Sequence, residues 1–469
     1  MAEGGRFRWD ALRSRVGRAL LGSAAFPFAL QAAALVGLAL ALVNGWGGGL
    51  GVPADQIMTL RKTNLTTLLV WGLWWPAMIA GALALGRAWC TVCPMELVNR
   101  CGDLLARRGG WKRWSFAPWM RSGWLVIVGY VALQLSVAGL LIHRVPHYTS
   151  TMLVLLLGAA LATGLLFREP RSFCKGLCPA KALLTAYGRL TPVQLDVRDP
   201  QRCADCATRE CVSPARQGRF DGRSCPSLLK PWDRRPSDNC VLCLECAKAC
   251  PYGNVGLGVV RSNEGARRPE RLRPYEAAFV MLAAGFVAHE VIGEVKPLDA
   301  AFHLVPQALH DALPVIDFGW FEAFWFLGLF PLGLWAVTAL IAYAVGQRGA
   351  LRDLLIAAAT AAAPVVAVAH VAKAAAKVSS WGGYLPMALR EPRGLETLRA
   401  IVDHAVEPPG ALLGLPALGW VMLAGVALVA WRSCGWVRHA VPEGVRAATV
   451  GALVPAAFFA AALVAWWAM

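Results

Sequence analysis

Four closely spaced cysteines are the residues of this chain best suited to chemistry. They are Cys240, Cys243, Cys246 and Cys250, and Pro251 follows the last of them. The spacing C-x2-C-x2-C-x3-C-P is typical of bacterial [4Fe–4S] proteins, in which three thiolates bind one cluster and the fourth binds another. A short loop can point three sulfurs and its own backbone N–H groups at a common centre. The spacing therefore predicts one cluster here and requires a second cysteine group elsewhere.

That second group lies just upstream. It comprises Cys203, Cys206, Cys211 and, before Pro226, Cys225. We predict that the fourth ligands cross over between the groups. One [4Fe–4S] cluster then takes Cys240, Cys243, Cys246 and Cys225, and the other takes Cys203, Cys206, Cys211 and Cys250. Structural zinc, which favours two separated C-x2-C pairs, is the alternative. The wider gap before Cys211 and the insertion before Cys225 leave the type of the second cluster, or its fourth ligand, open.

Two further cysteine pairs follow apolar segments of the chain. They are Cys90 and Cys93 before Pro94, and Cys174 and Cys178 before Pro179. Each follows a basic and aromatic stretch, so the two C-P motifs look like an internal repeat. Proline interrupts a helix and so presents the thiols at a helix end. Together these four thiols could hold a third iron–sulfur cluster, with reduced structural pairs as the alternative. Cys101 is a spare ligand for this site, whereas Cys434 is expected to be an idle thiol.

The elements that position these cysteines are predicted to be membrane helices. Of the 469 residues, 57% are hydrophobic and only 16% are charged, and the mean hydropathy is +0.49. Soluble domains carry about a quarter charged residues. Apolar runs of about twenty residues can cross a bilayer. We expect nine such spans, at 19–43, 65–86, 122–142, 148–167, 275–293, 319–345, 353–376, 411–431 and 447–468.

The formal net charge of +17 is explained by basic residues in short loops beside these spans. Because such loops face the cytoplasm, the N-terminus and the cysteine-rich segment are predicted to be cytoplasmic in a multi-pass protein of the bacterial inner membrane. We find no nucleic-acid motif and expect no nucleic acid partner. The acidic loop at 294–318 then lies outside, with His303 and His310 solvated. The loop at 377–410, which begins with Lys377, is outside as well, although it is basic.

The predicted fold is an all-α polytopic membrane protein with a small inserted α+β dicluster ferredoxin-like domain. We expect a basic cytoplasmic N-terminus at 1–18 and a four-helix membrane core with the first C-P motif at 19–167. A cytoplasmic segment at 168–274 carries the second C-P motif and the ferredoxin cysteines, and a five-helix membrane domain follows at 275–469. A soluble insert of about 100 residues is marginally stable alone. The bound clusters are therefore expected to stabilise its fold.

Ionisable residues inside the predicted C-terminal spans are candidate functional groups, because charges are costly in a bilayer. They are His289, Glu290, His370 and Lys373. Three interpretations stay open. His289 and His370 could be the paired axial ligands of a b-type haem. Alternatively, His289 and Glu290 could accept protons from a quinol while His370 or Lys373 holds a quinone oxygen. In the third interpretation these polar groups only satisfy one another or reach the interface.

The order of spans, C-P motifs and ferredoxin cysteines over residues 19–265 resembles the membrane polyferredoxins of the NapH and NosR type. The motif at Cys90 is one residue shorter than the usual C-x3-C-P of that family. The five further spans are similar to those of longer membrane ferredoxins implicated in cyclic electron flow. The resemblance implies electron transfer between a redox partner protein and the quinone pool, as part of a quinol/quinone oxidoreductase system. A redox maturation factor for a partner enzyme and a redox-coupled ion pump component are the alternatives.

Overall fold

The computed structural model describes residues 7–217, 219, 221–233, 240–260 and 270–467. Residues 1–6 of the predicted basic N-terminus and residues 261–269 of the predicted ferredoxin segment lie outside this part. Eight helical stretches in the described residues are long and apolar enough to cross a membrane, so the chain is a multi-pass, mainly helical membrane protein. They are Phe28–Gly45, Leu65–Arg108, Pro146–Leu166, Pro274–Ile292, Phe318–Ala344, Leu351–Gly382, Leu415–Gly435 and Pro442–Trp467.

Two of the predicted spans are shortened or divided in the structure. The span predicted at 122–142 is helix α9 (Trp124–Gly139), whose 16 residues are fewer than the about twenty that cross a bilayer. The span predicted at 19–43 is divided into α1 (Arg15–Leu21) and α2 (Phe28–Gly45). The chain leaves α1 at Ser23, whose hydroxyl donates to the Leu20 carbonyl and accepts from the Phe26 N–H group. These bonds compete with continuation of the helix.

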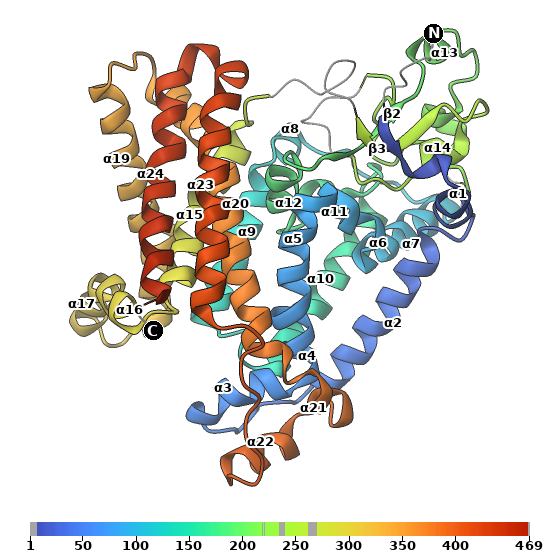
Figure 1. Ribbon diagram of the computed structural model, residues 1–469. Helices are drawn as coiled ribbons and strands as arrows, with labels where there is room; N and C mark the ends of the chain where they lie inside the picture. Colours follow the sequence, from blue (N-terminus) through green and yellow to red (C-terminus); the bar gives the residue numbers. More distant parts are fainter. Residues whose placement is uncertain (1–6, 218, 220, 234–239, 261–269, 468–469) are drawn as a thin grey trace. The chain divides into compact units, whose positions relative to one another are not determined.

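The chain forms two compact units, and each is described by itself. Unit 2 comprises Ala39–Ala80, Val126–Leu155 and Arg271–Met469. Within it, five helices lie side by side (Figure 1): α15 (Pro274–Ile292), α19 (Phe330–Ala344), α20 (Leu351–Gly382), α23 (Leu415–Ala440) and α24 (Val445–Val464). Small residues allow α20 and α24 to approach closely, since a Cβ atom at Gly451 would lie 2.4 Å from the Ala358 Cα. Such contacts are typical of membrane helix packing.

Unit 1 comprises Met1–Leu38, Gly81–Leu125 and Leu156–Glu270, and it contains a three-stranded antiparallel sheet. Its order is β1 (Phe7–Asp10), β3 (Val255–Val260), β2 (Val193–Val197). The register pairs Val193 with Val259 and Val197 with Val255. A β2–β3 pair therefore closes the segment that holds the ferredoxin-type cysteines, and Figure 1 shows helix α14 (Glu245–Ala249) beside this sheet. Buried Leu195, Leu244 and Val255 form the adjoining core together with Cys246.

Candidate functional site

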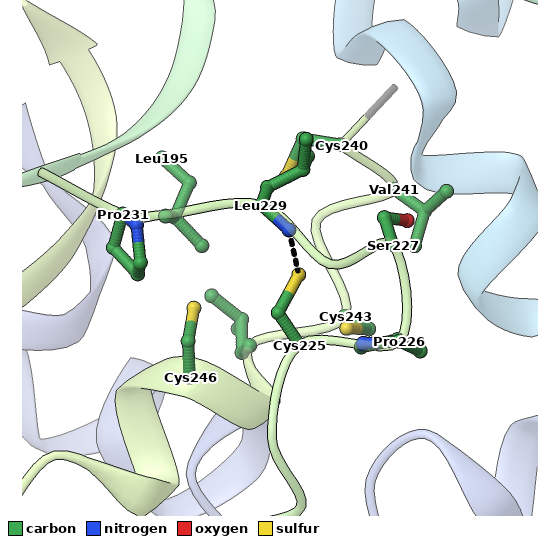
Figure 2. A pocket seen from close by; sticks show the side chains of 11 residues that line it. Leu195, Cys225, Pro226, Ser227, Leu229, Pro231, Cys240, Val241, Cys243 and Cys246 are labelled. Carbon is green, nitrogen blue, oxygen red and sulfur yellow. Dashed lines mark hydrogen bonds between the residues drawn. The ribbon is translucent and has the colours of Figure 1, made fainter. Parts of the chain in front are cut away.

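Four cysteines from the two ferredoxin-type groups line one pocket. They are Cys225, Cys240, Cys243 and Cys246, and Figure 2 shows them around the pocket with Leu195, Leu229 and Pro231. This is the set assigned to one cluster when the fourth ligands cross over. Leu242 and Leu244 adopt left-handed backbone conformations, with φ of 58° and 61°, which turn the short loop that carries three of the thiols. Burial raises the pKa of the Cys243 thiol to about 12.

Backbone N–H groups point at the sulfurs of this pocket. The Leu229 N–H donates to Cys225 Sγ at 3.4 Å, and the Leu242 N–H donates to Cys240 Sγ at 3.4 Å. Such bonds are among the interactions that set the reduction potential of an iron–sulfur cluster. The pocket therefore offers four thiols and two N–H donors in a largely apolar wall, which fits an anionic cubane.

The other four ferredoxin-type cysteines also form one group. Cys211 interacts electrostatically with Cys250, Cys203 and Cys206, and burial raises the pKa of its thiol to about 11. Asn254 donates its backbone N–H to Cys250 Sγ at 3.4 Å and its side-chain amide to Cys203 Sγ at 3.2 Å. Cys225 and Cys250 are thus equivalent, because each precedes a proline and accepts from the N–H four residues later.

The two C-P motifs form a third group of four thiols. Cys93 interacts electrostatically with Cys174, Cys90 and Cys178. In the first motif Cys90 lies in α6 (Trp89–Val92), Cys93 is extended, and Pro94 begins α7 (Pro94–Arg108). In the second, Cys174 lies in α11 (Ser172–Gly176), and Cys178 lies between this helix and α12 (Lys181–Gly188). Burial raises the pKa of the Cys178 thiol to about 12.

The spacing of the thiols bears on the choice between zinc and a cluster. One zinc ion holds two thiolates about 3.8 Å apart, given zinc–sulfur bonds of about 2.3 Å in a tetrahedron. In the described residues, one set of three His, Cys or acidic side chains has its ligand atoms within 4.8 Å of one another, and it consists of His289, His303 and Glu322. The three cysteine groups are therefore more open than mononuclear zinc sites. A cubane cluster, which places an iron at each thiolate, suits this wider arrangement.

Buried arginines surround a buried glutamate beside these groups, a feature that the sequence pattern did not reveal. Glu96 Oε1 lies 3.1 Å from Arg223 Nη2 and 3.9 Å from Arg171 Nε, and Glu96 Oε2 accepts from Gln31 at 2.8 Å. Arg100 also acts electrostatically on Glu96. All five side chains are buried. Glu96 thus faces three guanidinium groups, and the buried Glu245 also acts electrostatically on Arg100 and Arg223. Three guanidinium groups and two carboxylates leave an excess of buried positive charge, which is costly unless other anions offset it.

Arg171 lies near thiols of two different groups. Although burial lowers the pKa of its guanidinium, the thiolates of Cys174, Cys90 and Cys243 with Glu96 raise it, and the net pKa is above its ordinary value. The Arg171 Nη2 atom and the Ser224 hydroxyl are buried without a hydrogen-bond partner in the part of the chain that the structure describes. Anionic clusters beside these side chains would offset their charge.

A buried hydrogen bond joins the loops of two thiol groups. The Thr91 hydroxyl, between Cys90 and Cys93, donates to the Val241 carbonyl, between Cys240 and Cys243. Removing one partner of a buried hydrogen bond leaves the other unsatisfied, at a cost of about 1–3 kcal/mol. We therefore expect Thr91→Val to lower the free energy of unfolding by that amount, measured by denaturant titration of the purified protein. Thr91→Ser keeps the hydroxyl and should stay within about 1 kcal/mol of the wild type; equal losses in both variants would contradict the role of this bond.

Glu290 acts electrostatically on the other candidate residues of the C-terminal spans, which are His289, His370 and Lys373 of unit 2. Glu290 Oε2 lies 3.5 Å from both Lys373 Nζ and Lys377 Nζ, and Lys373 also pairs with Glu294 at 2.7 Å. Lys377 lies within α20, because this helix continues to Gly382 beyond the predicted span end at 376. The prediction that Lys377 begins an outer loop is therefore wrong.

The positions of His289 and His370 bear on the haem interpretation, in which a haem must bind between the two imidazoles. The His289 ring stacks on Phe326, with centroids 4.8 Å apart, and the His370 ring contacts Phe286 at 5.8 Å. Phe286 and Phe326 are themselves 6.0 Å apart. Phenylalanine rings thus occupy the space between the two imidazoles.

His289 instead meets His303 and Glu322. The prediction that His303 is solvated is wrong, since its side chain is 15% exposed and its Nε2 lies 3.1 Å from Glu322 Oε1. His310 bonds through Nδ1 to the Ile316 carbonyl at 3.0 Å. Glu322 was missed because no cysteine or histidine motif accompanies it in the sequence.

Comparison with known proteins finds a distant relative. The chain is 26% identical to an uncharacterized protein of Methanocaldococcus jannaschii over 211 residues, which are 45% of this chain and 75% of that protein. No known family profile and no solved structure matches the chain.

Proposed function

We propose that this chain is a membrane-bound iron–sulfur protein that carries electrons between a redox partner protein and the quinone pool. The observation that carries this proposal is the gathering of twelve cysteines into three groups of four within unit 1. Each group supplies the four thiolates of one [4Fe–4S] cluster, with the fourth ligands Cys225 and Cys250 exchanged between the ferredoxin-type groups. The clusters supply one-electron chemistry when bound, and the chain holds and tunes them.

Contacts between the loops support an order for the three centres. The Cys225 N–H donates to the Cys211 carbonyl at 2.9 Å, which joins the group of Cys203 to the group of Cys240. The Thr91–Val241 bond joins the group of Cys240 to the C-P group. In this proposal the C-P group, part of which lies in the apolar stretch Leu65–Arg108, exchanges electrons with quinone, and the group of Cys203 faces the protein partner.

The buried arginines support the same proposal. A [4Fe–4S] cluster with four thiolates carries net negative charge, so Arg171, Arg223 and Arg87 would be its counter-charges. The Arg87 guanidinium donates to Cys90 Sγ at 3.8 Å. Without such an anion, the burial of these guanidinium groups would carry a large desolvation cost.

The proposal is tested by anaerobic reoxidation of the cluster-loaded protein with a short-chain quinone, followed by the visible absorption of the clusters. We expect quinone to reoxidise the wild type and Cys434→Ser alike. Cys93→Ser, which removes a ligand of the proposed exit centre, should slow reoxidation at least about tenfold while the ferredoxin-type clusters remain. No reoxidation of the wild type would refute the quinone role and favour a maturation factor.

A further inference from the structure

Three side chains from separate elements converge in unit 2, whereas the cysteine groups of the proposed function belong to unit 1. His289 lies in the last turn of α15 (Pro274–Ile292), and His303 directly follows α16 (Lys296–Phe302). Glu322 lies in α18 (Phe318–Phe324), one turn before the π-helical segment Trp325–Leu329. Such π-helical segments occur frequently at functional sites.

The distances in this cluster are those of a metal site. Ligand atoms of all three side chains lie within 4.8 Å of one another. Glu322 Oε1 is 3.1 Å from His303 Nε2 and 3.9 Å from His289 Nε2. In tetrahedral zinc sites, nitrogen and oxygen ligands about 2.0–2.1 Å from the ion are separated from one another by about 3.3 Å. The three atoms therefore need to move little to surround one ion.

The ring of His303 is held through both of its nitrogens. Nδ1 lies 2.8 Å from the Asp299 carbonyl oxygen and 3.1 Å from its carboxylate, and Nε2 lies 3.1 Å from Glu322 Oε1. These oxygens accept, so both nitrogens donate when no ion is bound, and a metal ion at Nε2 would replace the proton there while Nδ1 keeps its own. Metal-binding histidines almost always donate their second nitrogen to a carbonyl or carboxylate in this way. His303 is thus already oriented as a ligand.

The surroundings make the cluster accessible from one side and dry on the other. The His289 ring stacks on Phe326 at an interplanar angle of 13°, and Phe302 lies 6.2 Å from it. The three side chains keep 15–20% exposure, enough for an ion to enter. Two cations act electrostatically on the cluster, Lys373 on His289 and Arg144 on Glu322, and Lys373 is itself paired with Glu294 and Glu290.

We infer that His289, His303 and Glu322 bind one zinc ion, with the fourth position open to water. Two imidazoles and one carboxylate suit zinc, whereas magnesium and calcium prefer all-oxygen sites. The three protein ligands and one open position correspond to the arrangement found in zinc enzymes with a His2Glu set. The ion would tie the end of α15 to α16 and α18. This inference does not depend on the iron–sulfur proposal.

The test uses the full-length protein with its clusters, treated with a chelator and then incubated with zinc. Zinc and iron are counted in the same samples, and the zinc X-ray absorption edge reports the ligand atoms. We expect one zinc per chain with nitrogen and oxygen neighbours at about 2.0 Å, rather than sulfur at about 2.3 Å. Glu322→Gln and His289→Gln should weaken zinc binding at least tenfold with the iron content unchanged.

The matched control is His310→Gln. His310 lies in α17 (Leu304–Ala312), its described hydrogen bond goes to the Ile316 carbonyl, and its ring contacts Phe318 and Phe321. This variant should bind zinc as the wild type does. Absence of stoichiometric zinc in the wild type, a sulfur shell, or undiminished binding in Glu322→Gln would overturn the inference. Failure of the iron–sulfur proposal would appear separately, as low iron content in the wild type.

Discussion

Cys243→Ser is expected to lower the iron content of the purified protein from about twelve to about eight atoms per chain, the loss of one four-iron cluster. Cys243 is buried in the pocket with Cys225, Cys240 and Cys246, so no other side chain of that pocket can supply the missing thiolate. Serine is a far weaker ligand because its hydroxyl is not ionised at neutral pH. The measurement is iron and acid-labile sulfide per chain, after anaerobic purification, together with the electron paramagnetic resonance spectrum of the reduced protein.

Two further variants separate the three centres. Cys93→Ser should remove only the cluster of the C-P group, again leaving about eight iron atoms. Cys434→Ser is the control, because Cys434 packs against the apolar core of unit 2 and belongs to none of the groups. This variant should keep about twelve iron atoms per chain. A wild-type content of about eight, with no change in Cys93→Ser, would mean that the C-P thiols bind no cluster. Zinc in place of iron after anaerobic purification would reject the ferredoxin assignment itself.

Glu96→Gln is expected to destabilise the protein by about 3–5 kcal/mol, as observed when one partner of a buried ion pair is removed. Glutamine has the same shape, but it leaves Arg223 and Arg171 without the carboxylate that lies 3.1 and 3.9 Å from them. Both guanidinium groups are buried, so water cannot replace the lost anion. The measurement is the free energy of unfolding from denaturant titration, with the iron content as a second readout.

The control for this prediction is the same acid-to-amide change at an exposed ion pair. Asp353 lies 2.8 Å from Arg271, and the two side chains are 65% and 38% exposed. Exposed pairs contribute about 0–1 kcal/mol, so Asp353→Asn should have little effect. An equally small loss in Glu96→Gln would show that anions other than Glu96, the clusters foremost, balance the arginines.

Local patterns were enough to predict the membrane helices and the candidate cluster ligands. An apolar run of bilayer length has few alternatives to a helix, since every backbone group must be bonded within the segment. Cysteine spacing is equally local, because the loop Cys240–Cys246 must bend its own backbone to converge its thiols. Helix ends were less predictable: the break at Ser23 and the extension of α20 to Gly382 depend on side-chain bonds and packing that hydropathy does not register.

Which distant residues meet could be seen only after the helices had packed. The membrane helices and the close spacing of the cysteines are evident in the sequence, because both properties reside in short segments. The assembly of Glu96 with Arg171 and Arg223, the bond from Thr91 to Val241, and the convergence of His289, His303 and Glu322 join residues from separate helices and loops. Such contacts carry no local signature, since their free energy comes from burial and charge pairing that exist only once the helices have packed.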